Sequence, residues 1–133
     1  MYKAIVDKVG GYLFFVFRVL VGFLFFQHGA QKLLGWFGGI PMNAMMYAAG
    51  FIELAGGILI IFGLFTRLTA TVTALEMLAA YFIAHAPSGW NPFQFGGNGG
   101  ELALLYFASF LVMIIYGAGR FSVEQALWKK ELF

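Results

Sequence analysis

Apolar residues are grouped into four long segments, which are separated by short stretches rich in glycine, proline or charge. The segments span about residues 11–34, 42–65, 68–86 and 101–118. Each approaches the ~20 residues that an α-helix needs to cross ~30 Å of hydrocarbon. The first is long enough to tilt or to project from the membrane. The pattern therefore predicts an all-α fold, a four-transmembrane-helix bundle.

Three short connections join these segments. Residues 35–41 end in Pro41, which we expect to begin the second helix because proline is favoured in the first helical turn. Residues 63–67 form a tight turn, and residues 87–100 form a longer loop rich in glycine, proline and aromatic residues. The first segment is too long for a signal peptide and no small-residue cleavage site follows it, so we expect it to be retained.

The distribution of lysine and arginine predicts the topology. One side carries six of these residues, namely Lys3, Lys8, Arg67, Arg120, Lys129 and Lys130. The other side carries Lys32 alone, next to loops whose tryptophans suit an interfacial aromatic belt. The positive-inside rule then places both termini in the cytoplasm of a multi-pass protein in a bacterial-type cytoplasmic (inner) membrane.

The chain divides into a transmembrane domain, residues 1–119, and a cytoplasmic interfacial tail, residues 120–133. Within the tail, Ser122 and Gln125 have the spacing of a helix capping box. Its aromatic and leucine residues can enter the membrane interface while its lysines meet anionic lipid. The lipid bilayer is therefore an expected partner of the tail as well as of the helices.

Composition narrows the classes of function. The chain is 62% hydrophobic and 11% charged, against about 45–50% and about 25% for soluble domains. A net charge of +2 does not indicate a nucleic-acid partner, and the absence of cysteine excludes disulfides and thiolate metal sites. The glycine-rich run at 96–100 lacks the lysine and hydroxyl residue of a phosphate loop, so no cofactor is encoded by a recognisable motif.

Three charged residues fall near mid-membrane, namely Arg18, Glu53 and Glu76. Counting ~1.5 Å per residue gives them similar depths, so we expect one central layer. The layer can be a buried ion pair that fixes helix register, or a polar pocket that binds a small molecule or carries protons. One arginine against two glutamates leaves a carboxylate without a cation, which makes Glu53 and Glu76 the proton-active candidates.

A second polar group lies nearer the outer face and comprises His28, Lys32, His85 and Glu101. His28 and Lys32 are four residues apart and share a helix face. Lys32 can belong to a pocket or can extend to the interface as a snorkelling residue. His85 should face away from Glu76 unless the helix is distorted. Two histidines without cysteine do not indicate a metal site.

Several short motifs together resemble the DoxX family of small four-helix membrane proteins. They are Arg18, the run at 27–33 (QHGAQKL), the run at 51–57 (FIELAGG), the turn at 63–67 (GLFTR) and the run at 117–124 (GAGRFSVE). The last run has glutamate where the family often has aspartate. The resemblance spans nearly the whole chain and implies a redox or quinone context. The DoxX family includes the membrane subunit of a thiosulfate:quinone oxidoreductase and relatives linked to oxidative stress.

The leading hypothesis is therefore a DoxX-type subunit that binds quinone-like molecules and receives electrons from a partner oxidoreductase. Whether the chain is itself part of an enzyme stays open at this point. The alternative is a non-catalytic scaffold or assembly subunit of an oxidative-stress or respiratory complex. A small transporter is a third possibility and would require a homo-oligomer. The candidate ligand-binding residues are Arg18, His28, Lys32, Glu53, Glu76, His85 and Glu101.

Overall fold

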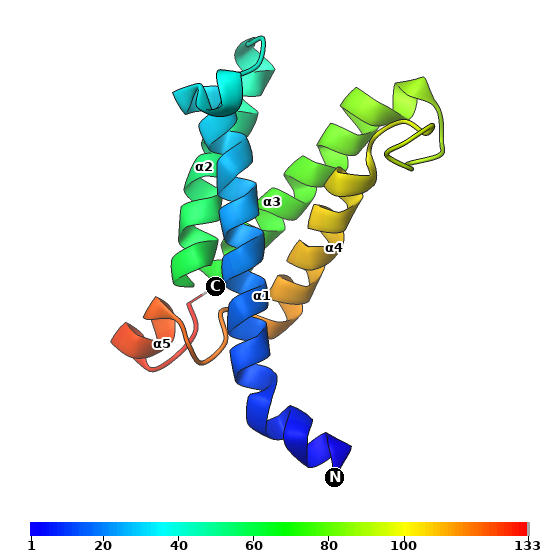
Figure 1. The fold of residues 1–133 in the computed structure, drawn as a ribbon. Helices are drawn as coiled ribbons and strands as arrows, with labels where there is room; N and C mark the ends of the chain where they lie inside the picture. Colours follow the sequence, from blue (N-terminus) through cyan, green and yellow to red (C-terminus); the bar gives the residue numbers. More distant parts are fainter. Residues whose placement is uncertain (133) are drawn as a thin grey trace.

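The computed structural model describes residues 1–132, and these fold into helices with no β-strand among them. The elements are α1 (Tyr2–Leu34), η1 (Trp36–Gly38), α2 (Ala44–Phe62), α3 (Thr66–Ala80), η2 (Tyr81–His85), η3 (Ala86–Ser88), α4 (Glu101–Tyr116) and α5 (Val123–Trp128) (Figure 1). The prediction of an all-α fold is confirmed for the described residues.

Three of the helical stretches are long and apolar enough to cross a membrane. They are α1, α2 and the continuous stretch Thr66–Ser88, which joins α3 to η2 and η3. The fourth apolar helix, α4, is shorter at 16 residues. These helices coincide with the four segments that the hydropathy predicts, and their outward faces carry many exposed large apolar side chains. The four-helix membrane bundle is thus confirmed.

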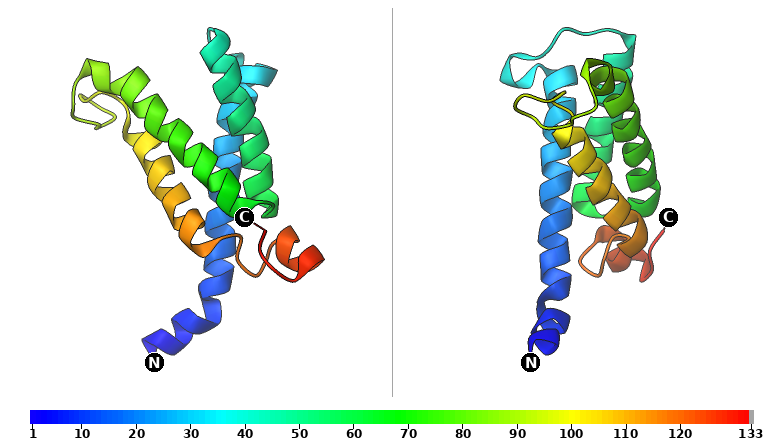
Figure 2. Two further views of the ribbon diagram at one scale, coloured as in Figure 1. Left: turned by 180° about the vertical axis from the view of Figure 1, so that it is seen from behind. Right: turned by 90° about the vertical axis from the view of Figure 1, so that its right-hand side faces the viewer.

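The helices form two hairpins, α1 with α2 and α3 with α4, each packed along its length. The hairpins meet at the turn between α2 and α3 and diverge toward the opposite end, which gives the molecule the outline of a V (Figures 1 and 2). A core of buried residues crosses the junction, with Phe25 from α1, Ile60 from α2 and Phe110 from α4 fully buried. This junction fixes the angle between the hairpins.

Glycines set the close approach of α1 and α2. A side chain at Gly57 would meet the Phe26 backbone, with Cα only 2.7 Å from the added Cβ. A side chain at Gly50 would lie 2.9 Å from the Cβ of Lys32, and one at Gly29 would meet the backbone of Leu54. Small residues let membrane helices pack with their backbones in contact. Gly57 has this role in the packing of α1 against α2.

Two helix boundaries differ from the sequence prediction. The first helix begins at Tyr2, and its first turns bend away from the bundle (Figure 1). The second helix begins at Ala44 and not at Pro41, because Asn43 adopts an extended conformation and its side chain accepts a hydrogen bond from the Met46 N–H at 3.0 Å. That side-chain cap satisfies a free helix N–H, which Pro41 could not do.

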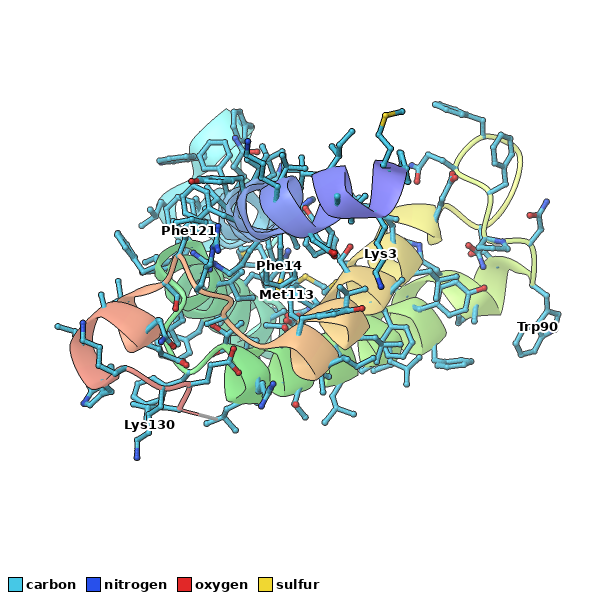
Figure 3. The ribbon with its side chains drawn as sticks, turned by 90° about the horizontal axis from the view of Figure 1, so that it is seen from below. Lys3, Phe14, Trp90, Met113, Phe121 and Lys130 are labelled. Atoms are coloured by element: carbon cyan, nitrogen blue, oxygen red, sulfur yellow. The ribbon has the colours of Figure 1, made fainter. Side chains whose placement is uncertain are left out.

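The two ends of the molecule differ in character. The η1 turn and the loop before α4 lie at one end, whereas both termini and α5 lie at the other (Figures 1 and 2). Trp90 projects away from the helices at the loop end, and Lys130 projects away from the tail, while Phe14 and Met113 lie between helices (Figure 3). The two termini therefore share one side, and its cytoplasmic assignment remains a prediction from the lysine and arginine distribution.

Replacing Gly57 with alanine should lower thermal stability. The new methyl group would overlap the Phe26 backbone and force α1 and α2 apart, and overpacking of this kind costs about 1–3 kcal/mol. Thermal unfolding in detergent, followed by helical circular dichroism, measures the change. Gly10→Ala is the matched control, because a side chain there meets nothing within 4 Å. Equal melting temperatures for the two variants would contradict the packing role.

Candidate functional site

A cavity of about 770 Å³ lies between the two hairpins and takes its walls from all four long helices. The walls are mainly apolar, and the polar and aromatic groups among them are His28, Lys32, Glu53, Glu76, His85, Gln94 and Tyr106. This volume and this mixture of apolar wall and few polar groups are typical of small-molecule sites. Five of the seven predicted site residues therefore line one cavity.

Lys32 of α1 and Glu53 of α2 form an ion pair on the cavity wall. The Lys32 ammonium donates to Glu53 Oε2 at 2.6 Å, and the side chains are 12% and 6% exposed. The glycine-mediated contact of α1 with α2 places them together, because Gly50 lies against the Lys32 side chain. An ammonium has three donors, so Lys32 keeps two N–H groups beyond the one given to Glu53.

Glu76 of α3 stands apart from that pair. Both of its carboxyl oxygens are buried, and neither has a hydrogen-bond partner among the described residues. An oxygen acceptor that is buried without a donor is costly. Glu76 is therefore the polar group of the cavity that a ligand could complete.

His28 and Tyr106 line the same cavity from α1 and α4. Their rings meet edge to face, with centroids 5.7 Å apart. The sequence analysis missed Tyr106, because one tyrosine in an apolar helix carries no signal of its own. Its position three residues after Ala103 and four before Phe110, both buried, could have placed it on the inward face.

His85 reaches the cavity because the third span is distorted. The residues of η2 form a π-helical turn, which changes the direction of the following side chains, and His85 lines the same cavity as Glu76. Its Nδ1 lies 3.1 Å from the carbonyl oxygen of Asn98. Since a carbonyl only accepts, Nδ1 carries the hydrogen in this contact.

Asn98 organises the loop around that histidine. Its side-chain amide donates to the Gly89 carbonyl at 2.8 Å and to the Tyr81 hydroxyl at 3.2 Å. Glu101, by contrast, is exposed and does not line the cavity. It accepts a hydrogen bond from the Gln94 N–H at 3.1 Å. The structure thus separates Glu101 from the other outer residues and gives it a role in the loop.

The expected central layer of Arg18 with Glu53 and Glu76 is wrong. Arg18 is 1% exposed and makes hydrogen bonds with four backbone carbonyls and with neither glutamate. Its guanidinium donates to Ile60 at 3.0 Å, to Ile61 at 3.3 Å, to Phe121 at 2.8 Å and to Ala118. The depth count failed because the first turns of α1 project beyond the bundle, so Arg18 lies level with the end of α2.

This arrangement has a clear electrostatic cause. Carbonyls in the last turn of a helix lack intrahelical partners, and the helix dipole favours a cation there. At the end of α2, Arg18 supplies both the hydrogen-bond donor and the positive charge. Its guanidinium also donates to the segment after α4. Glu124 completes the junction, since it is 1% exposed and accepts from the Thr66 N–H, the first of α3, at 3.0 Å.

The tail is therefore tied to the bundle by buried polar contacts. Ser122 caps α5 as predicted, because its hydroxyl accepts from the Gln125 N–H at 3.2 Å. The Glu124 N–H donates to the Gly63 carbonyl at 3.2 Å. The sequence analysis noted Glu124 only as a departure from a family pattern and missed this structural role.

Comparison with known proteins identifies the relatives of the chain. The DoxX family model matches residues 13–86. An uncharacterized protein of Haemophilus influenzae is 38% identical over 93% of this chain and 97% of its own length. The inner membrane protein YqjF of Escherichia coli is 33% identical over 86% and 92%, and the protein named putative oxidoreductase CatD of Bacillus subtilis is 40% identical over 47% and 52%. No solved structure matches.

Removing the guanidinium should loosen the junction of the hairpins. Arg18→Met leaves four carbonyls without their donor, and hydrogen bonds to a charged group are worth about 1.5–3 kcal/mol each. We expect a lower unfolding temperature and faster proteolysis of the tail. Arg120→Met is the matched control, because Arg120 is exposed and its guanidinium lies over the rings of Tyr12 and Phe121. Unchanged stability of Arg18→Met alone would refute the role.

Proposed function

This chain belongs to the DoxX family of multi-pass bacterial inner-membrane proteins, and we propose that it binds a quinone-like molecule between its hairpins and works with a partner oxidoreductase. The observation that carries the proposal is the cavity of about 770 Å³, with apolar walls and a few polar groups. A hydrophobic ring compound that dissolves in the bilayer fits this combination better than a polar solute does. The oxidoreductase name of the Bacillus relative is in keeping with it.

The polar groups suit the two ends of a quinone-like ring. Lys32 has N–H groups beyond its bond to Glu53, and these can donate to a ligand oxygen. The rings of Phe25 and Tyr106, whose centroids lie 5.3 Å apart, offer an aromatic wall against which a flat ligand can pack. Orientation thus comes from a few polar contacts and affinity from the apolar walls.

Proton exchange is the other requirement. Reduction of a quinone to a quinol takes up two electrons and two protons, and the electrons would come from the partner oxidoreductase. Glu53 and Glu76 line the cavity and can exchange protons with a bound ligand, since carboxyls act as general acids and bases. His28 and His85 also line it, so protons need not cross bare hydrocarbon.

Binding can be measured directly on the full chain in lipid nanodiscs. We expect saturable binding of tetramethyl-para-benzoquinone by isothermal titration calorimetry. Lys32→Met should weaken it about tenfold, which corresponds to the loss of one hydrogen bond. The single variant leaves Glu53 buried without its cation. The double variant Lys32→Met, Glu53→Gln removes both charges, and it tests the loss of the Lys32 hydrogen bond to the ligand without that cost.

Glu101→Gln is the matched control, because Glu101 lies outside the cavity. Its affinity should equal that of the wild type. The proposal fails if the wild type shows no saturable binding, or if the cavity variants bind as tightly as the Glu101 variant does.

A further inference from the structure

We infer that Glu76 makes the cavity select ligands that present a hydroxyl donor, so that a quinol binds more tightly than its quinone. The inference rests on the proposed function and adds a direction to it. It names the form of the ligand that the site holds, and it assigns that preference to one side chain on α3.

Glu76 is the unfilled position of the site. Both carboxyl oxygens are buried and lack a partner among the described residues, and the side chain lines the cavity. The nearest charge of opposite sign along the walls is Lys32, and its ammonium is bonded to Glu53 at 2.6 Å. Lys32 is bonded to Glu53, whereas both carboxyl oxygens of Glu76 are left with acceptor capacity.

The remaining donors of the cavity do not fill that position. His85 Nδ1 is engaged with the Asn98 carbonyl at 3.1 Å. His28 and Tyr106 meet ring to ring, and none of His28, Tyr106 and Gln94 forms a hydrogen bond with Glu76. A donor for Glu76 must therefore come from outside the described residues, and a ligand in the cavity is placed to supply it.

The chemistry of the carboxyl group decides which ligand is favoured. In either protonation state, at least one of its oxygens can only accept a hydrogen bond. A quinone offers only carbonyl acceptors, so that oxygen stays without a donor. A quinol hydroxyl donates to it, and the same hydroxyl or the one across the ring can accept from Lys32. One such hydrogen bond corresponds to about tenfold in affinity.

This preference has a redox consequence. A site that binds the reduced form more tightly raises the midpoint potential of the bound couple, by about 30 mV for each tenfold in a two-electron couple. Such a site favours reduction of a bound quinone and slows release of the quinol. The bound couple is then a stronger electron acceptor than the same couple free in the membrane.

The test uses three probes with the same ring and different donors. They are tetramethyl-para-benzoquinone, tetramethylhydroquinone and the dimethyl ether of that hydroquinone, which cannot donate. Equilibrium binding is measured anaerobically on the full chain in nanodiscs. We expect the hydroquinone to bind wild type about tenfold more tightly than either of the other probes.

Variants at position 76 then test whether Glu76 causes the preference for the hydroquinone. Glu76→Met removes the acceptor and should bring the hydroquinone-to-quinone affinity ratio close to one. Glu76→Leu removes the acceptor with a different apolar side chain, so the ratio should also fall close to one, even if the methionine variant does not fold. Glu101→Gln, outside the cavity, should keep the wild-type ratio.

The outcomes separate the two proposals. Saturable binding of the quinone and hydroquinone with equal affinity overturns the selection by Glu76 and leaves the cavity site standing, as does a preference for the quinone. A wild-type ratio that persists in Glu76→Met or Glu76→Leu also overturns it. Failure of all three probes to bind overturns the proposed function itself.

Discussion

The buried guanidinium of Arg18 is the contact on which the arrangement of the molecule depends. It joins the carbonyls at the end of α2 to those of the segment that follows α4, and so it ties the two hairpins together at one end. Glu124 secures the same junction from the tail by accepting from the first N–H of α3. Free backbone groups at helix ends cannot turn to water inside a membrane, so side chains must supply their partners. The hairpins are fixed where these contacts lie.

The open arrangement of the hairpins at the opposite end is a consequence of their being joined at only one end. Away from the junction the hairpins diverge (Figure 1), and the cavity occupies the space between them with walls from both. Within the first hairpin, glycines bring α1 and α2 close enough for Lys32 to reach Glu53. Lys32 donates to Glu53 and not to Glu76, which is left without a partner on the facing hairpin. The site is therefore asymmetric, with a neutralised wall and a wall that retains unused acceptors.

The tail is part of the same structure. Its short helix is capped by Ser122 and tied through Glu124 to the turn between α2 and α3. Displacement of the tail would uncover Glu124 and release the Phe121 carbonyl, one of the four that Arg18 holds. The junction, and with it the angle between the hairpins, is thus coupled to the cytoplasmic segment predicted from the sequence.

The sequence by itself determined the four apolar spans, the all-α fold, the family and the inventory of intramembrane polar residues, because hydropathy and short motifs are local properties. Only the tertiary structure decided which charges meet, because pairing depends on the angle between hairpins and on where each helix truly begins. Depth counted from residue 11 put Arg18 beside the glutamates, whereas α1 begins at Tyr2 and projects beyond the bundle, so that Arg18 lies beside the carbonyls at the end of α2. The π-helical turn likewise brought His85 to the cavity, and Tyr106 and Glu124 acquired their roles from neighbours that are distant in sequence.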